Sequence, residues 1–298
     1  MKIIDPHIHL FDLSLGEYQW LKPENPPFWS DKEVINNKFS ETDINLSTQT
    51  KALELTGFVH IEAGFDNESP WREIQWLEAS CKNDFRSVAC IDLTAPADDF
   101  IKQINTLIDY KSVVGCRHIL DDSACDILSH KNTFNNLKLL ADNQLSFDLQ
   151  MPLSDLKAIQ ILTDILKHLP ELTIIINHAG SPPYFIKDHS NNIAVQSSEL
   201  DHWLNGLKTL SQFEHCAIKC SGWEMEDRNY SSVWCDDIIA HCIQAFGINR
   251  VMLASNFPLC LFSKDYLKVW QYHSRLATYN QKQLTQLCLE NTKHWYKF

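Results

Sequence analysis

The stretch Asp5-Pro6-His7-Ile8-His9 lies in the first predicted strand, Met1–Leu10. Successive side chains of a strand point to opposite faces, so Asp5, His7 and His9 are expected on one face. Two imidazoles one strand period apart can bind a single divalent metal through one ring nitrogen each. A pair of hydrogen-bonded structural histidines has the same spacing, so the polar ends of the other strands have to decide between the two interpretations.

From Gly57 onward, short apolar runs alternate with segments of helical period. Including the first, the predicted strands are Met1–Leu10, Gly57–Gly64, Arg86–Leu93, Val113–Leu120, Leu145–Met151, Leu172–Gly180, Cys216–Gly222 and Arg250–Pro258. The predicted helices are Trp71–Asn83, Asp98–Tyr110, Thr133–Asn143, Ser154–His168, Glu199–Gln212, Ser232–Phe246, Lys264–Tyr279 and, behind an Asn280 N-cap, Gln281–Phe298. This alternation predicts an α/β fold, a (β/α)8 TIM barrel forming a single domain over residues 1–298. An open doubly wound sheet is the alternative, but no two of the 8 glycines stand as Gly-x-Gly, so its dinucleotide-binding fingerprint is absent.

The segment Tyr18–Trp29 separates the first two predicted strands. Its three prolines and four aromatic residues exclude a regular helix and indicate an ordered loop. We expect it to form either a pocket wall or lid, or a satellite hydrophobic cluster.

The composition indicates the cellular compartment and the class of partner that we expect for this chain. The 298 residues are 44% hydrophobic, no apolar run approaches the roughly 18 residues of a membrane span, and the start Met-Lys-Ile-Ile-Asp is unlike a signal peptide. The 10 cysteines are scattered without a Cys-x-x-Cys pair, which is typical of reduced core residues. The net charge of −12 argues against nucleic acid and anionic membranes as partners. We therefore expect a cytoplasmic protein with a small-molecule substrate, and the sequence leaves a homo-oligomer open.

Every predicted strand ends in a group that can ionise or hydrogen-bond. The inward-facing candidates are Asp5, His7 and His9; His60 and Glu62; Cys90 and Asp92; Arg117; Ser146, Asp148 and Gln150; Ile174, Ile176 and His178; Lys219 and Ser221; and Asn256. His118 falls on the opposite face unless its strand has already ended. Any one of these is explained as a solvated strand end, but burying so many charges is costly unless they pair with one another, a metal or a ligand. The set predicts a site at the carboxyl ends of the strands.

The chain resembles the amidohydrolase superfamily, in the branch that contains sugar lactonases and 2-pyrone-4,6-dicarboxylate lactonases. The resemblance rests on Asp5–His9, His60–Ala63, Gly115–Leu120, Phe147–Gln150, Asn177–Gly180, Lys219–Gly222, Arg250–Pro258 and Glu290–Tyr296. It implies a barrel hydrolase in which His7, His9 and His178 surround the attacking water, in some members with a bound divalent metal such as Zn or Mn.

Asn256 departs from the pattern of the superfamily, which usually carries an aspartate at the end of strand 8. An amide cannot accept the proton of the attacking water. Either Asp148, Asp5, Glu62 or a histidine supplies the base, or the activity is weak, or the reaction asks less of a base. Metal binding stays open because a negative charge is missing.

The expected reaction is hydrolysis of a lactone, the cyclic ester of a sugar acid or of a small carboxylated compound. A lactone is an activated ester, so a positioned water, a base and a cation suffice. The predicted catalytic residues are His7, His9, His178, Asp148 and Asn256, and His7, His9 and His178 are the predicted metal ligands. Substrate binding is assigned to Arg117 and Lys219, which would hold a carboxylate or the oxyanion, together with His118, His60 and Glu62. The alternatives are a non-oxidative decarboxylase of the same broad family and a ligand-binding protein whose site has degenerated, as Asn256 would indicate.

Overall fold

The computed structural model describes residues 1–48, 50, 52–185 and 197–298. Its strands are β1 (Lys2–Ile8), β2 (Glu54–Ile61), β3 (Phe85–Cys90), β4 (Val113–Ile119), β5 (Ser146–Gln150), β6 (Ile174–Ile176), β7 (Cys216–Cys220) and β8 (Val251–Leu253). These eight strands of the described chain form one sheet in the order of the chain, with parallel pairing. The fold is the predicted (β/α)8 TIM barrel, so the predicted fold class is confirmed.

Helices alternate with the strands. They are α1 (Glu41–Thr48), α2 (Trp71–Ser80), α3 (Ala97–Leu107), α4 (Ala124–Leu128), α5 (Thr133–Asp142), α6 (Leu156–Leu166), α7 (Ser197–Ser211), α8 (Trp223–Glu226), α9 (Ser232–Phe246), α10 (Tyr266–His273), α11 (Gln281–Thr285) and α12 (Asn291–Trp295). The predicted Asn280 cap is confirmed, because its side chain accepts from the Gln283 amide at 3.1 Å in a capping box at the start of α11. The short helices α1, α4 and α8 lie in segments for which no helix was predicted.

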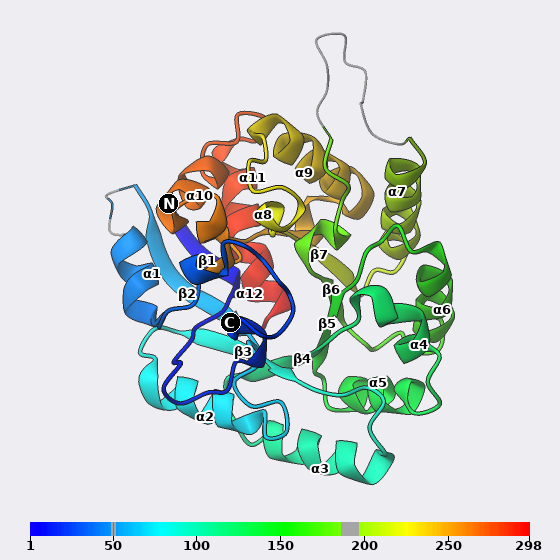
Figure 1. The fold of residues 1–298 in the computed structure, drawn as a ribbon. Coiled ribbons are helices and arrows are strands. Elements are labelled where there is room, and N and C mark those ends of the chain that lie inside the picture. The colour runs from blue at the N-terminus through cyan, green and yellow to red at the C-terminus, as the bar shows by residue number, and fades with distance from the viewer. Residues whose placement is uncertain (49, 51, 186–196) are drawn as a thin grey trace. The chain divides into compact units, whose positions relative to one another are not determined.

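The chain forms two compact units. Unit 1 comprises residues 1–91, 103–117 and 253–298, and in Figure 1 its strands β1, β2 and β3 run side by side in blue and cyan. Unit 2 comprises residues 92–102 and 118–252, and its strands β5, β6 and β7 are neighbours. The predicted site residues are divided between the two units.

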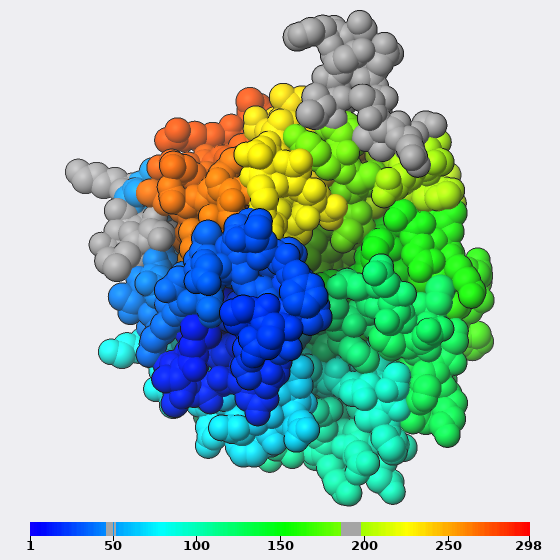
Figure 2. Space-filling model, in the orientation of Figure 1, coloured from blue at the N-terminus to red at the C-terminus, as the bar shows by residue number. Residues whose placement is uncertain are grey.

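The aromatic loop between β1 and β2 is fastened to other parts of unit 1. The Trp20 indole N–H donates to the Ala63 carbonyl at 2.7 Å, just beyond β2. The rings of Trp29 and Phe262 are 5.6 Å apart, beyond the end of β8. Figure 2 shows this N-terminal segment, in blue, as a compact mass on the face toward the viewer. The loop is thus an ordered aromatic cluster packed on residues that follow two of the strands.

Two expectations drawn from composition have structural counterparts. All ten cysteines lie in the described part of the chain, and most of them are buried. None of the described helices combines the length and the apolar character that crossing a membrane requires.

Candidate active site

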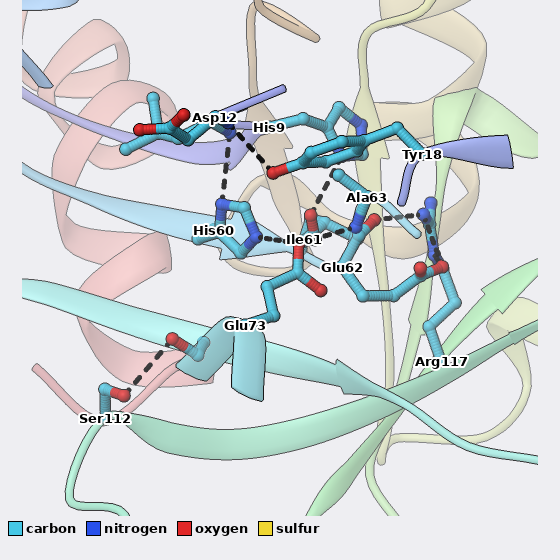
Figure 3. Close-up of polar contacts among 12 residues, drawn as sticks. His9, Asp12, Tyr18, His60, Ile61, Glu62, Ala63, Glu73, Ser112 and Arg117 are labelled. Carbon is cyan, nitrogen blue, oxygen red and sulfur yellow. Dashed lines mark hydrogen bonds and ion pairs between the residues drawn. The ribbon is translucent and has the colours of Figure 1, made fainter. Parts of the chain in front are cut away.

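His7 and His9 are buried at the carboxyl end of β1, and their Nε2 atoms are 3.2 Å apart. The two rings meet nearly edge to face, at 74°. His9 Nδ1 lies 2.8 Å from the Ile61 carbonyl, which can only accept, so Nδ1 carries a proton (Figure 3). A neutral His9 therefore keeps its lone pair on Nε2, the atom that faces His7.

This pair has the geometry of two metal ligands. Two nitrogens at about 2.0–2.1 Å from a tetrahedral ion are separated by roughly 3.3 Å, close to the spacing of the two Nε2 atoms. Neutral imidazole is also the form that binds metals. Within the described residues, no group of three His, Cys, Asp or Glu side chains is arranged to hold an ion. The pair fits two ligands of a divalent ion.

The chain beyond β8 is fixed against β1 at the same place. Asn256 has a left-handed backbone (φ 59°), a conformation that asparagine tolerates better than most residues. Its backbone N–H donates to the His7 carbonyl at 3.0 Å. Because β8 ends at Leu253, Asn256 is not a strand residue, and strand alternation does not determine its direction. It is 1% exposed.

Asp5 ties β1 to the segment after β8. Its Oδ2 accepts from Ser255 Oγ at 2.5 Å and from the Trp270 indole at 3.2 Å, and its Oδ1 accepts from the backbone of Ser255 and of His7. Burial raises the pKa of Asp5 to about 6, although these hydrogen bonds oppose the shift. Both oxygens of Asp5 are thus used within the protein.

His60 is engaged through both ring nitrogens (Figure 3). Nδ1 accepts from the Leu10 amide at 3.2 Å, so the proton is on Nε2, which donates to Glu73 at 3.0 Å. Glu73 also accepts from the Ala63 amide at 3.0 Å, and burial raises its pKa. His60 therefore links the end of β1, through Glu73, to the start of α2.

Glu62 and Arg117 form a buried ion pair in unit 1 (Figure 3). Arg117 Nη2 and Nε lie 2.7 and 2.8 Å from the same carboxylate oxygen, and Nη2 also donates to the Glu62 carbonyl at 2.8 Å. The side chains are 5% and 6% exposed, so each charge is neutralised by the other away from water.

Asp148 and Lys219 form the corresponding pair in unit 2. Lys219 Nζ is 2.6 Å from Asp148 Oδ2, and both side chains are completely buried. Asp148 belongs to β5 and Lys219 to β7, so the pair reaches across the face of β6 between them. The contact shows that these two residues share a face, as strand alternation predicts.

The predicted direction of side chains on β6 is wrong. The register pairs Asp148 with Ile175 and Leu149 with Ile176, and paired residues of parallel strands share a face. Ile175 therefore lies on the Asp148 face, whereas Ile174 and Ile176, predicted to face inward, point the other way. The run of three isoleucines gave no polar mark that could distinguish the two faces.

His178 lies beyond β6 in a run of left-handed residues, at φ 53°. Its Nδ1 is 3.0 Å from Ser221 Oγ, on the segment that follows β7. A Cβ at Gly222, where φ is 73°, would stand 2.6 Å from the same nitrogen, so glycine is needed to seat the ring. The turn and this packing, rather than strand alternation, place His178.

His118 lies near the end of β4 and is partly exposed. Its Nδ1 accepts from the Leu93 amide at 3.1 Å and lies 3.8 Å from Asp92 Oδ1. Asn177, which precedes His178, was not predicted as a site residue. It is 2% exposed, and neither of its amide atoms has a hydrogen-bond partner within the described residues.

The chain is similar to known proteins over its full length. The amidohydrolase family model matches residues 4–298. The "Uncharacterized protein y4mH" of Sinorhizobium fredii (strain NBRC 101917 / NGR234) is 26% identical over 307 residues, which cover 99% of this chain and 98% of the relative. An amidohydrolase of Burkholderia multivorans, solved with bound HEPES and with bound zinc, is 18% identical with a TM-score of 0.79 over 100% of both chains. A Pseudomonas putida protein assigned as a 2-pyrone-4,6-dicarboxylic acid hydrolase is 16% identical, with a TM-score of 0.69 over 99% of this chain and 97% of that one.

Proposed function

The chain belongs to the amidohydrolase family, and we propose that it hydrolyses a lactone, the cyclic ester of a sugar acid. The observation that carries the proposal is the His7–His9 pair, whose Nε2 atoms face each other at 3.2 Å with the His9 proton fixed on Nδ1. When His7 also carries its proton on Nδ1, the pair can hold a water molecule, or the metal that binds it, by two lone pairs. The zinc found in the Burkholderia multivorans relative supports a divalent ion, Zn or Mn, as the group that the pair binds.

A histidine is the proposed base. Each carboxylate that the sequence offered for this role is engaged: Asp5 by Ser255 and Trp270, Glu62 by Arg117, and Asp148 by Lys219. Glu62 and Asp148 are each held at under 3 Å by a cation of the protein, and both oxygens of Asp5 accept hydrogen bonds within the protein. Histidine has an unperturbed pKa near 6.5 and can exchange a proton near neutral pH. We assign the proton to His7, His9 or His178 and assign Asn256 to orienting the water.

The two buried ion pairs favour a neutral substrate. Arg117 and Lys219 were expected to bind a carboxylate or the developing oxyanion, and each is paired with a carboxylate of the protein. A carboxylated lactone would bring a permanent negative charge, whereas Arg117 and Lys219 are each already paired with a carboxylate of the protein, and an uncompensated buried charge is costly. We therefore favour a polyhydroxylated sugar lactone over a carboxylated pyrone.

The reaction follows from these roles. The water oxygen attacks the lactone carbonyl carbon as a histidine takes the water proton, and the carbonyl oxygen becomes an oxyanion. We assign the Lys219 ammonium, held by Asp148, to stabilising this charge, which is transient, unlike the permanent charge of a substrate carboxylate, and we assign His118 to substrate binding. The ring C–O bond then breaks, the histidine returns the proton to the leaving oxygen, and the hydroxy acid is released. A bound divalent metal would supply Lewis acidity to the water, while Glu62, Arg117 and His60 position the strand ends.

A screen of sugar lactones and carboxylated pyrones with a pH indicator, with and without Zn²⁺ or Mn²⁺, tests the proposal. Acid release from a sugar lactone is expected, and His9→Ala should lower kcat/KM by about 10²–10⁴-fold, the usual scale for general acid–base catalysis. His168→Ala, at an exposed histidine after α6, is the matched control and should leave kcat/KM unchanged. Release of CO₂ from an aromatic acid without any lactone opening would replace the proposal with a decarboxylase.

A further inference from the structure

Asn177 carries two buried amide atoms that the described residues leave without a hydrogen-bond partner. The residue is 2% exposed. Buried polar groups of native proteins are nearly always hydrogen-bonded, and one that is not costs stability. An amide in this state is a defect of the core, is bound to an internal water, or is a group kept for a ligand, and its place in the sheet favours the ligand.

The register puts Asn177 on the face that carries the Asp148–Lys219 pair. Ile175 is paired with Asp148 on one side and with Ala217 on the other, and Asn177 is one strand period further along. The Asn177 backbone is extended (φ −81°, ψ 149°), and its backbone N–H donates to the Leu149 carbonyl at 2.8 Å. The strand alternation therefore still holds at this position. Continuing the register of β6 and β7 by one position pairs Asn177 with Lys219. The side chains of these two residues therefore point to the same side of the sheet.

The backbone around Asn177 is held rigidly. Its carbonyl accepts from the Gly180 amide at 2.9 Å, and the Gly180 carbonyl accepts from the Leu153 amide at 2.9 Å. Gly180 has φ 69°, and a Cβ there would stand 2.2 Å from Leu153, so this approach requires glycine. Left-handed residues such as His178 and Ala179 are costly and cluster at functional sites. The turn therefore preorganises the amide as well as the His178 ring.

We propose that Asn177 binds a hydroxyl group of the substrate ring. A side-chain amide donates and accepts without carrying charge, which matches a hydroxyl group, since a hydroxyl does both. This inference rests on the proposed function, which identifies the substrate as a lactone. Asn177 adds discrimination: a ring with hydroxyl groups satisfies the buried amide, and an unsubstituted lactone leaves it unpaired.

Asn177→Leu tests this assignment, because leucine has a similar size and no polar atoms. We measure kcat/KM for a sugar lactone and for δ-valerolactone, which has no ring hydroxyl. The variant should lose roughly 5- to 100-fold on the sugar lactone, the scale of two neutral hydrogen bonds, and little on δ-valerolactone. Thr163→Val is the matched control, because Thr163 in α6 carries another buried oxygen without a partner in the described chain and has no proposed role. It should leave both values unchanged.

Equal losses on the two lactones, or no loss on either, would overturn the role of Asn177 and leave the proposed lactonase intact. A wild type that opens neither lactone would contradict the proposed function. In that case, calorimetric binding of 1,5-anhydroglucitol, a polyhydroxylated ring without an ester, decides the inference. Weaker binding to Asn177→Leu than to wild type supports it, and equal or absent binding refutes it.

Discussion

Replacing Lys219 by methionine should destabilise the protein by about 3–5 kcal/mol, the cost of leaving one partner of a buried ion pair uncompensated. Lys219 and Asp148 are both completely buried, and the Nζ–Oδ2 distance is 2.6 Å. At this distance and an effective dielectric constant of about 20, the attraction is roughly 6 kcal/mol, which bounds the effect from above. In the variant the carboxylate would remain buried without its cation.

Urea unfolding of three proteins measures this effect: wild type, Lys219→Met, and the double variant Lys219→Met with Asp148→Leu. The double variant should regain most of the loss, because replacing a whole buried pair by apolar residues is often neutral. Lys167→Met is the control, since Lys167 pairs with Asp164 at 2.9 Å with both side chains more than half exposed, and such pairs contribute under about 1 kcal/mol.

The same three proteins separate structure from chemistry. If Lys219 stabilises the oxyanion, the double variant should recover its stability but not its kcat/KM on the lactone. Loss of less than about 1 kcal/mol in Lys219→Met, or a double variant as unstable as the single one, would refute the electrostatic reasoning. Full recovery of turnover would remove Lys219 and Asp148 from the proposed mechanism.

Three further changes test other parts of the chain. Burial and acidic neighbours raise the pKa of Glu226 to about 7, above its unfolded value, so the stability linked to its protonation is present below about pH 4 and lost as the pH rises through 7. Glu226→Gln should therefore stabilise by up to about 3 kcal/mol at pH 8 and much less at pH 5 in urea unfolding, and an equal gain at both would contradict it. Asn256→Asp should leave kcat/KM unchanged or lower it, whereas a gain of orders of magnitude would show that the wild type has lost its base. Gly222→Ala should lower kcat/KM at least roughly tenfold, because the added Cβ would meet the His178 ring, and an unchanged value would contradict this account of how the ring is seated.

Strand alternation predicted side-chain directions where a strand carried polar residues. Ser146, Asp148 and Gln150 alternate with apolar residues on β5, and Asp148 was correctly placed on one face with Lys219. On β6 the three isoleucines are buried on both faces, as in most parallel sheets, so the sequence has no period of two to detect. Only the register with β5 assigns Ile175 to the Asp148 face.

Residues beyond the strand ends follow turns that the sequence does not specify. His178 and Asn256 were placed by extending strands that in fact stop at Ile176 and Leu253. Both residues have positive φ, which redirects their side chains. The family resemblance predicted them as site residues, but their directions depend on contacts with Ser221 and His7 that come from distant parts of the chain.

The sequence also did not predict which residue pairs with each buried charge. Arg117 was expected to meet a substrate carboxylate, and the structure pairs it with Glu62, a residue predicted to bind substrate itself. With this pair and the Asp148–Lys219 pair each internally neutral, the uncharged Asn256 adds no negative charge for a cation. A divalent ion would then be held mainly by neutral imidazoles, which lowers the affinity expected for it. A reaction that needs little activation of its carbonyl suits such a site, and ring opening of a lactone meets that condition better than hydrolysis of an amide.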